Sequence, residues 1–192
     1  MSVVLQSADL TLRPWEPGDA DALAALTGDE ELRRWTSHRV DGPEEAERWI
    51  AVQEAGWTSG ERLGFAALAA GRVVGHVVLR PSADRTCGEI GYWTGAPARG
   101  LGVASRAVEL LTGWAFDTET GPGLSRLELI HNAGNPASCR VAQKTGYALE
   151  GILPPRGAHE AEGHLHARER GPCPGRDGTA RSAERGRLGR NG

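Results

Sequence analysis

The spacing of apolar residues changes twice within the first sixty positions, which predicts a strand followed by two helices. Residues 10–15 are expected to form a short strand that ends in a turn. Apolar residues then recur at helical spacing over 19–26, where Asp19 is the expected N-cap, and over 43–57, where Pro43 suits the first turn of a helix. The N-terminal third therefore supplies one strand and two helices.

Three apolar stretches in the middle of the chain predict antiparallel strands. Residues 64–70 and 73–79 are separated only by Gly71-Arg72, a spacing typical of a β-hairpin. Residues 87–94 are expected to add a third strand to this hairpin. These stretches predict the centre of a sheet.

The second half returns to helical spacing, interrupted by strands. After a glycine-rich loop over 94–102, one helical face gathers the apolar residues Ala104, Ala107, Val108, Leu111, Trp114 and Ala115. A strand is expected over 126–131, then a helix with Asn135 as N-cap and Gly146 just beyond its end, then a strand over 147–153. The order β-α-α-β-β-β-α-β-α-β predicts a mixed α/β fold.

Composition limits the range of functions. The chain has 192 residues and a formal net charge of −3, and it shows neither an apolar run long enough for a membrane span nor a signal-peptide pattern at its start. We therefore expect a soluble cytoplasmic protein with one domain over residues 1–170 and no membrane or nucleic-acid partner. Residues 171–192 hold five arginines, six glycines and one large aliphatic residue, so this basic tail is expected to be disordered.

Cysteines and histidines predict no metal site. The three cysteines, Cys87, Cys139 and Cys173, are odd in number and form no Cys-x-x-Cys pair, so reduced thiols are expected. A second group could offer ligands near the C-terminus, but its spacing fits no standard zinc pattern: His159, Glu162, His164, His166 and Cys173.

The loop Arg99-Gly-Leu-Gly-Val-Ala104 stands between a predicted strand and a predicted helix. Small residues there allow an anion to approach backbone N–H groups at the start of the helix. A P-loop is excluded because Leu101-Gly102 stands where Lys-Ser/Thr is needed, and a Rossmann fingerprint fails at Ser105. The loop is therefore a candidate phosphate site of another kind.

Further motifs surround this loop in a characteristic order. They are Ile90-Gly-Tyr-Trp, Arg99-x-x-Gly102-x-Ala104, Asn135-x-x-Ser138, Lys144-Thr-Gly-Tyr147 and Leu149-Glu-Gly151. On these motifs the chain, from about residue 10 to 151, resembles the N-acetyltransferases of the GNAT superfamily, in particular the RimJ/RimL branch, which acetylates the N-terminal amines of ribosomal proteins. The resemblance implies a mostly antiparallel sheet, flanked by helices, in which two neighbouring strands splay apart.

The resemblance also implies a binding mode for acetyl-CoA. The pyrophosphate would lie on the amides of residues 99–104, the pantetheine arm would pair with the backbone of residues 92–94, and an N–H near Trp93 or Thr94 would stabilise the developing oxyanion. No metal is implied. The expected cofactor-binding residues are Tyr92, Trp93, Thr94, Arg99, Gly100, Leu101, Gly102, Val103, Ala104 and Asn135.

Catalytic roles follow from the same resemblance. Ser138 matches the residue that protonates or hydrogen-bonds the thiolate leaving group, and Tyr147 is an alternative acid. Glu89 is the first candidate for the base, with His76 and Glu160 as further candidates. Each residue also has a structural interpretation, because Ser138 and Asn135 suit a helix N-terminus, Tyr147 suits the core, and Glu89 suits a solvated strand face.

The acceptor is expected to be a primary amine, most simply a protein N-terminal α-amine, whose pKa of about 7.7–8.0 needs little help from a base. Residues offering negative charge and aromatic faces near it are Asp29, Glu30, Glu31, Trp35 and Trp49. Small-molecule amines, such as a polyamine or an aminoglycoside, are the alternative acceptors. A non-catalytic acetyl-CoA-binding module is a third hypothesis, because the strand that begins at Gly163 passes into the tail without the expected apolar residues. A homodimer also stays open.

Overall fold

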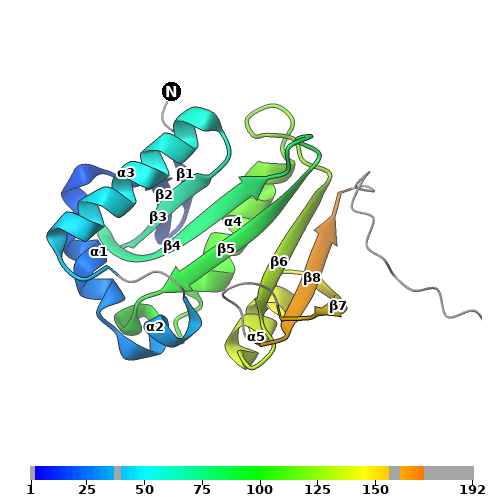
Figure 1. The fold of residues 1–192 in the computed structure, drawn as a ribbon. Coiled ribbons are helices and arrows are strands. Elements are labelled where there is room, and N and C mark those ends of the chain that lie inside the picture. Colours follow the sequence, from blue (N-terminus) through cyan, green and yellow to red (C-terminus); the bar gives the residue numbers. More distant parts are fainter. Residues whose placement is uncertain (1–2, 37–39, 156–160, 171–192) are drawn as a thin grey trace, which may run out of the picture.

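The computed structural model describes residues 3–36, 40–155 and 161–170, which form an eight-stranded sheet with helices on both faces (Figure 1). The strands lie in the order β1-β2-β3-β4-β5-β6-β8-β7, and all neighbours are antiparallel except β5 and β6. Their bounds are Leu5–Ser7, Leu10–Pro14, Leu63–Ala69, Arg72–Pro81, Cys87–Thr94, Arg126–Asn132, Ala148–Leu153 and Gly163–Glu169 for β1 to β8.

Helices α1 (Ala20–Thr27), α2 (Glu30–Trp35) and α3 (Pro43–Ser59) contribute to one apolar cluster. Leu23, Ile50 and Ala66 are buried there against Trp15 and Trp93. The burial of these aromatic and aliphatic side chains holds the three N-terminal helices on the sheet.

The second cluster involves α4 (Val103–Phe116) and α5 (Pro136–Lys144), and α4 lies on the opposite face of the sheet from α3 (Figure 1). Val108, Leu111 and Ala115 are fully buried against Phe65 and Leu127. These are the residues that the helical periodicity assigns to the apolar face, so that prediction is confirmed. Packing on α4 fixes where its N-terminus meets the end of β5.

The fold class predicted from the sequence is confirmed, with three additional elements. Strand β1 and helix α2 are short segments whose periodicity is too brief to recognise. Helix α2 begins at the N-cap Asp29, which accepts a hydrogen bond of 3.0 Å from the Leu32 amide. Strand β8 lies between β6 and β7, so both of its edges are hydrogen-bonded although its sequence is largely polar.

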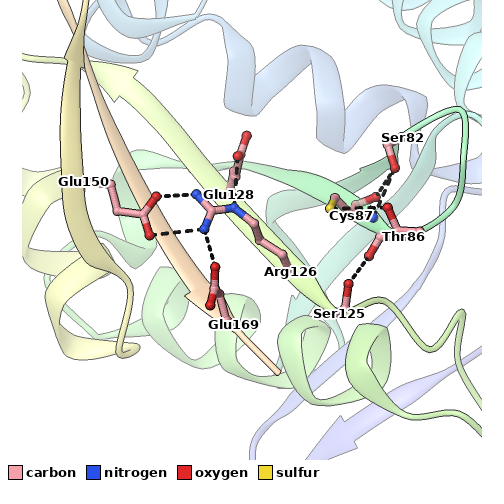
Figure 2. A network of polar contacts seen from close by, with 8 residues as sticks. All are labelled: Ser82, Thr86, Cys87, Ser125, Arg126, Glu128, Glu150 and Glu169. Carbon is pink, nitrogen blue, oxygen red and sulfur yellow. Dashed lines mark hydrogen bonds and ion pairs between the residues drawn. The ribbon is translucent and has the colours of Figure 1, made fainter. Parts of the chain in front are cut away.

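A group of ion pairs holds β8 in this position (Figure 2). Arg126 of β6 binds Glu128 at 3.2 Å, Glu169 of β8 at 2.7 Å and Glu150 of β7 at 3.1 Å. The hydrogen bonds that Arg126 donates to these carboxylates, the one to Glu150 above all, raise the pKa of its guanidinium. The arginine therefore links the last three strands of the sheet through side chains as well as backbone.

The cysteines differ in state. Cys139 carries a free thiol, whereas Cys87 is disulfide-bonded, so the expectation of reduced thiols is wrong for Cys87. An odd cysteine count excludes only a fully paired framework, not a single bond. Near Cys87, Ser82 and Ser125 donate hydrogen bonds to the backbone oxygens of Cys87 and Thr86 and tie this turn to the start of β6 (Figure 2).

None of the helices in the described part of the chain is both long and apolar enough to cross a membrane. The predicted tail, residues 171–192, lies outside the described residues.

Candidate functional site

The parallel pairing of β5 with β6 stops halfway along both strands. It runs from Cys87 opposite Arg126 to Ile90 opposite Leu129. Beyond this point, residues 91–94 of β5 do not pair with residues 130–132 of β6. A cleft of about 770 Å³ opens there, lined by residues from both strands, α2, α4 and α5. We call it the β5–β6 cleft. It is the splayed strand pair that the resemblance implied.

The glycine-rich loop opens onto this cleft at the start of α4. Gly100 and Gly102 have φ angles of 76° and 74°, a left-handed conformation that favours glycine. The first hydrogen bond of the helix runs from the Arg106 amide to the Gly102 carbonyl, so the amides of residues 103–105 have no acceptor in the described part of the chain. These amides remain available to an anion.

The side chains of this segment differ in their surroundings. Leu101 is exposed, Val103 is buried in the core and Ala104 is half-buried at the cleft. Val103 can therefore contact a bound anion only through its backbone. Thr94, at the end of β5, is half-buried, and Trp93 is buried in the cluster beneath α1–α3.

Arg99 is engaged with α2 rather than with the amides of its own loop. Its guanidinium binds Asp29 and, at 3.1 Å, Glu31, while its Nε donates to the Thr94 carbonyl at 3.2 Å. The hydrogen bond from Arg99 lowers the pKa of Asp29. Two of the carboxylates expected to attract the acceptor amine are thus partly neutralised by the arginine expected to hold the pyrophosphate.

Two further cationic residues, Arg106 and Lys144, lie beside the loop, and the sequence motifs predict no role for them. A Cβ placed on Gly102 would lie 3.5 Å from Nη1 of Arg106 and 3.9 Å from Nζ of Lys144. Lys144 is the chain's only lysine, a signal that could have been used. Because α5 packs against α4, this lysine reaches a loop more than forty residues away in the sequence.

The predicted acid and its neighbours meet in the cleft. Asn135 is the N-cap of α5 and accepts a hydrogen bond of 3.2 Å from the Ser138 amide, so Asn135 has the capping role considered for it, whereas Ser138 contributes its backbone amide to the cap. Tyr92 of β5 lines the same cleft, and its hydroxyl is buried without a hydrogen-bond partner in the described residues. Burial raises the pKa of Tyr92 to about 12, opposed by the nearby Ser138 side chain. The three polar side chains thus line one space.

The candidate bases have different surroundings. Glu89 lines the cleft and forms an ion pair of 3.0 Å with Arg80. His76 is buried, and its Nδ1 lies 3.0 Å from Nε1 of Trp15 and 3.1 Å from the Phe65 carbonyl, so this nitrogen is already engaged by the core. Glu160 lies outside the described residues.

Tyr147 lies away from the cleft. It is 1% exposed, and its hydroxyl shares a hydrogen bond of 2.6 Å with Thr112 of α4. Burial raises its pKa. Tyr147 therefore belongs to the core, which confirms the structural interpretation of this residue.

The two tryptophans considered for the acceptor site also differ in their surroundings. Trp49 packs edge-on against Trp15 and His76 with ring centroids 5.1 Å away in both pairs, so it is a core residue. Trp35, at the end of α2, is exposed and lines the cleft. Glu30 is exposed on the same helix.

Comparisons with known proteins agree with this geometry. Residues 9–148 match a family model described as an acetyltransferase (GNAT) domain. No curated protein matches the sequence.

Several solved structures share the fold at low sequence identity. The microcin C7 self-immunity acetyltransferase MccE, in complex with acetyl-CoA and AMP, superposes with a TM-score of 0.78 at 18% identity, covering 85% of this chain and 93% of MccE. The ribosomal-protein α-N-acetyltransferase RimL, in complex with coenzyme A, gives 0.79 at 18% identity and coverages of 87% and 98%. A ribosomal-protein-S5-alanine acetyltransferase from Vibrio fischeri gives 0.75, again at 18% identity, with coverages of 88% and 97%.

Proposed function

Because this chain belongs to the GNAT acetyltransferase family, we propose that it transfers the acetyl group of acetyl-CoA to the N-terminal α-amine of a protein. The family match identifies the chain as an acetyl-CoA-dependent N-acetyltransferase. Its acceptor, the roles of its site residues and its cytoplasmic location are our proposals. RimL and the Vibrio fischeri protein, whose names state ribosomal-protein acetylation, support this choice of acceptor.

The observation that carries the proposal is the early end of the β5–β6 pairing. On the side facing β6, residues 91–94 have no strand partner among the described residues, which leaves this edge to an extended, amide-bearing pantetheine arm that can hydrogen-bond to it as another strand would. The amides at the start of α4 lie at the same cleft and suit the pyrophosphate, because helix N-termini attract anions. The described residues thus fit acetyl-CoA.

Cations beside the loop support the same assignment. Arg106 and Lys144 lie close enough to Gly102 to neutralise phosphate charge, and hydrogen bonds between cations and phosphates are among the strongest in proteins. Arg99 would contribute by giving up its bonds to α2 or by keeping α2 against the loop.

Around the thioester, this chain supplies polar groups on two sides. Ser138 can protonate or hydrogen-bond the departing thiolate, and the buried hydroxyl of Tyr92 lies beside it. A backbone N–H near Trp93 or Thr94 would stabilise the charge that develops on the carbonyl oxygen, worth roughly 3–4 kcal/mol for one such donor.

The amine must lose a proton, and the cleft offers Glu89 for this, directly or through water. Arg80 forms an ion pair of 3.0 Å with the carboxylate and so holds Glu89 in place. An N-terminal α-amine has a pKa of about 7.7–8.0, against about 10.4 for lysine, and a weak base is sufficient for it at neutral pH.

The test is an acceptor panel assayed with labelled acetyl-CoA. A peptide with a free N-terminus and no lysine is expected to be acetylated, whereas the same peptide with a blocked N-terminus and one internal lysine is not. A polyamine and an aminoglycoside complete the panel. Turnover on these two alone would replace the proposed acceptor by a small amine, and tight acetyl-CoA binding without any turnover would favour the binding-only module.

A further inference from the structure

Four nitrogen- and sulfur-bearing side chains converge on one point. They come from β6, α5 and β8, which lie together at one end of the sheet (Figure 1). One ligand atom from each lies within 4.8 Å of the others. We call this set the histidine–cysteine cluster; it comprises His131, Cys139, His164 and His166.

The sheet register explains why these residues meet. His131 of β6 stands directly opposite His164 of β8 in the antiparallel ladder. His166 follows two positions after His164 and therefore points to the same face of the sheet. Cys139 comes from α5, and its sulfur lies 3.2 Å from Nδ1 of His164. Three separate elements thus contribute to one site.

Two of the imidazole rings are oriented by backbone carbonyls. Nδ1 of His131 lies 2.8 Å from the Asn132 carbonyl, and Nδ1 of His166 lies 3.4 Å from the Tyr147 carbonyl. A carbonyl only accepts, so the proton of each neutral ring is on Nδ1 and the lone pair is on Nε2. This is how metal-ligating histidines are oriented, with the second nitrogen donating to a backbone oxygen or a carboxylate.

Those lone pairs have no hydrogen-bond partner. Nε2 of His131 and Nε2 of His166 are both buried, and neither has a partner among the described residues. Buried polar atoms in proteins are rarely left without a partner, so two such atoms in one cluster call for a ligand. The ligand must accept electron pairs from nitrogen and from a neighbouring sulfur.

The distances suit a small tetrahedral ion. Nitrogen and sulfur atoms bonded to one zinc at about 2.0–2.1 and 2.3 Å lie about 3.3–3.6 Å apart. The contact between Cys139 and His164 is already at 3.2 Å, and the widest separation in the cluster, 4.8 Å, requires only small side-chain rotations.

We propose that the histidine–cysteine cluster binds one zinc ion in a closed, structural site. Three imidazoles and a thiolate are ligands that zinc prefers, whereas Ca²⁺ and Mg²⁺ prefer oxygen. Binding forms a sulfur–zinc bond and releases the thiol proton of Cys139 to solvent. With all four positions occupied by protein, the ion takes no part in acetyl transfer.

The ion would hold β8 and α5 to the end of β6. Cys139 is adjacent to Ser138, and His131 lines the same β5–β6 cleft as Ser138. The site would therefore fix the wall of the cleft that carries the predicted acid. The spacing of ligands in the sequence predicts no metal site. His131 and Cys139 lie outside the C-terminal group of possible ligands, and only the register of β6 against β8 brings His131 next to His164.

Metal analysis of the full-length protein tests this directly. The protein is stripped with a chelator and titrated with Zn²⁺ in competition with a chromophoric chelator, and separately with Co²⁺. We expect one zinc per chain, a higher Tm with the ion bound, and a cobalt spectrum with tetrahedral ligand-field bands and a thiolate charge-transfer band. A chain that binds neither ion at this stoichiometry would overturn the proposal.

Variants locate the ion without relying on acetyltransferase activity. Cys139→Ser should abolish the thiolate band, and His164→Asn should weaken zinc binding by more than about 100-fold, since loss of a supporting second-shell residue alone costs 10–100-fold. Both residues are only half-buried, so folding should survive. Gln143→Ala, an exposed change on the same helix, is the matched control and should bind zinc as the unmodified chain does. Unchanged affinity in both ligand variants would show that any bound ion lies elsewhere.

Discussion

Gly102 combines two requirements at one residue. Its positive φ lets the chain turn into α4 without strain, and its missing side chain leaves room for an anion beside the helix amides, Lys144 and Arg106, whose guanidinium also binds the Leu101 carbonyl and Asp9. A substitution there changes the backbone and the binding surface together, so its test needs a control that carries the same backbone strain.

We predict that Gly102→Glu abolishes acetyl-CoA binding, because it places a carboxylate where the pyrophosphate is proposed to lie. Gly71→Glu is the control: Gly71 has a φ of 73°, almost equal to the 74° of Gly102, and lies in the exposed β3–β4 turn. Isothermal titration calorimetry should show wild-type affinity for the control alone. Equal affinity in both variants would remove the phosphate assignment.

Ser138 allows a clean test of the acid role. The backbone amide of Ser138 donates the capping hydrogen bond to Asn135, so Ser138→Ala leaves the cap intact and removes only the hydroxyl. We predict a kcat lower by about 100-fold with little change in the KM for acetyl-CoA, as expected for loss of a general acid. Steady-state kinetics measure both constants. An unchanged kcat would contradict the acid role of Ser138 and make Tyr92 the next candidate.

Among the elements, the junction between β2 and α1 shows how a local signal acquires a second role. Asp19 is the N-cap residue of α1, as predicted, but its side chain makes no capping bond to the helix. Instead it accepts two hydrogen bonds from Arg13 of β2, at 2.7 and 2.8 Å, and one from the Glu16 amide at 3.0 Å. The carboxylate therefore ties strand to helix.

This pair predicts a pH-dependent loss of stability. Burial opposes ionisation of Asp19, but the bonds from Arg13 and the Glu16 amide outweigh it and lower its pKa. A lowered folded-state pKa gives stabilisation that is complete above the unfolded-state value of about 3.9 and disappears as the pH falls through the folded-state value.

Asp19→Asn should therefore lower the free energy of unfolding by about 1.5–3 kcal/mol at pH 7 and by much less at pH 3. Urea unfolding at both pH values measures this difference. A penalty that stays the same at pH 3 would mean that the charge of Asp19 is not what stabilises the junction.

The end of the sheet depends on Arg126 in a similar way. Its side chain is 13% exposed and joins β6, β7 and β8, and its partner Glu128 is 6% exposed (Figure 2). Arg126→Ala should cost about 3–5 kcal/mol, because the largely buried pair of Arg126 with Glu128 loses one member and Glu150 and Glu169 lose the partner they share.

Arg48→Ala on α3 is the matched control for Arg126. Its side chain is 66% exposed and pairs with Glu44 and Glu45 at 3.9 and 3.8 Å, so its loss should cost no more than about 0.5 kcal/mol. Urea denaturation compares the two variants, and equal penalties would contradict the role given to the network.

For the whole molecule, completion of the sheet by β8 matters most. The polar sequence of this strand suggested an incompletely walled acceptor side, which motivated the binding-only hypothesis. The structure inserts β8 between β6 and β7, with hydrogen bonds on both edges, so that motivation no longer applies. The acceptor hypothesis rests on a continuous sheet whose described strands β5 and β6 separate at one end.

Ligand binding to this opening should stabilise the whole fold. Acetyl-CoA at 100 times its Kd should add about 2.7 kcal/mol to the free energy of unfolding, which corresponds to a Tm rise of about 5–10 °C for a chain of this size. Thermal denaturation with and without acetyl-CoA measures it. The Gly102→Glu variant should show no rise; an equal rise there would place the ligand elsewhere.

Much of the fold could be predicted because local chemistry specifies it. Helix periodicity identified the buried face of α4, and the sequence Asn135-Pro136 marked the start of α5. Short elements were missed because α2 and β1 hold too few residues for a period to show. Of the candidate site, the sequence located the loop, the strand, the cap residue Asn135 and Ser138, but their roles stay predictions.

The sequence by itself determined the order of the elements and the family, since turn chemistry, capping and periodicity are properties of neighbouring residues. Only the tertiary structure decided where the β5–β6 pairing stops, which carboxylates hold Arg99, and that three histidines meet Cys139. These outcomes depend on strand register and on packing between residues up to 70 positions apart, and no local pattern encodes such distances.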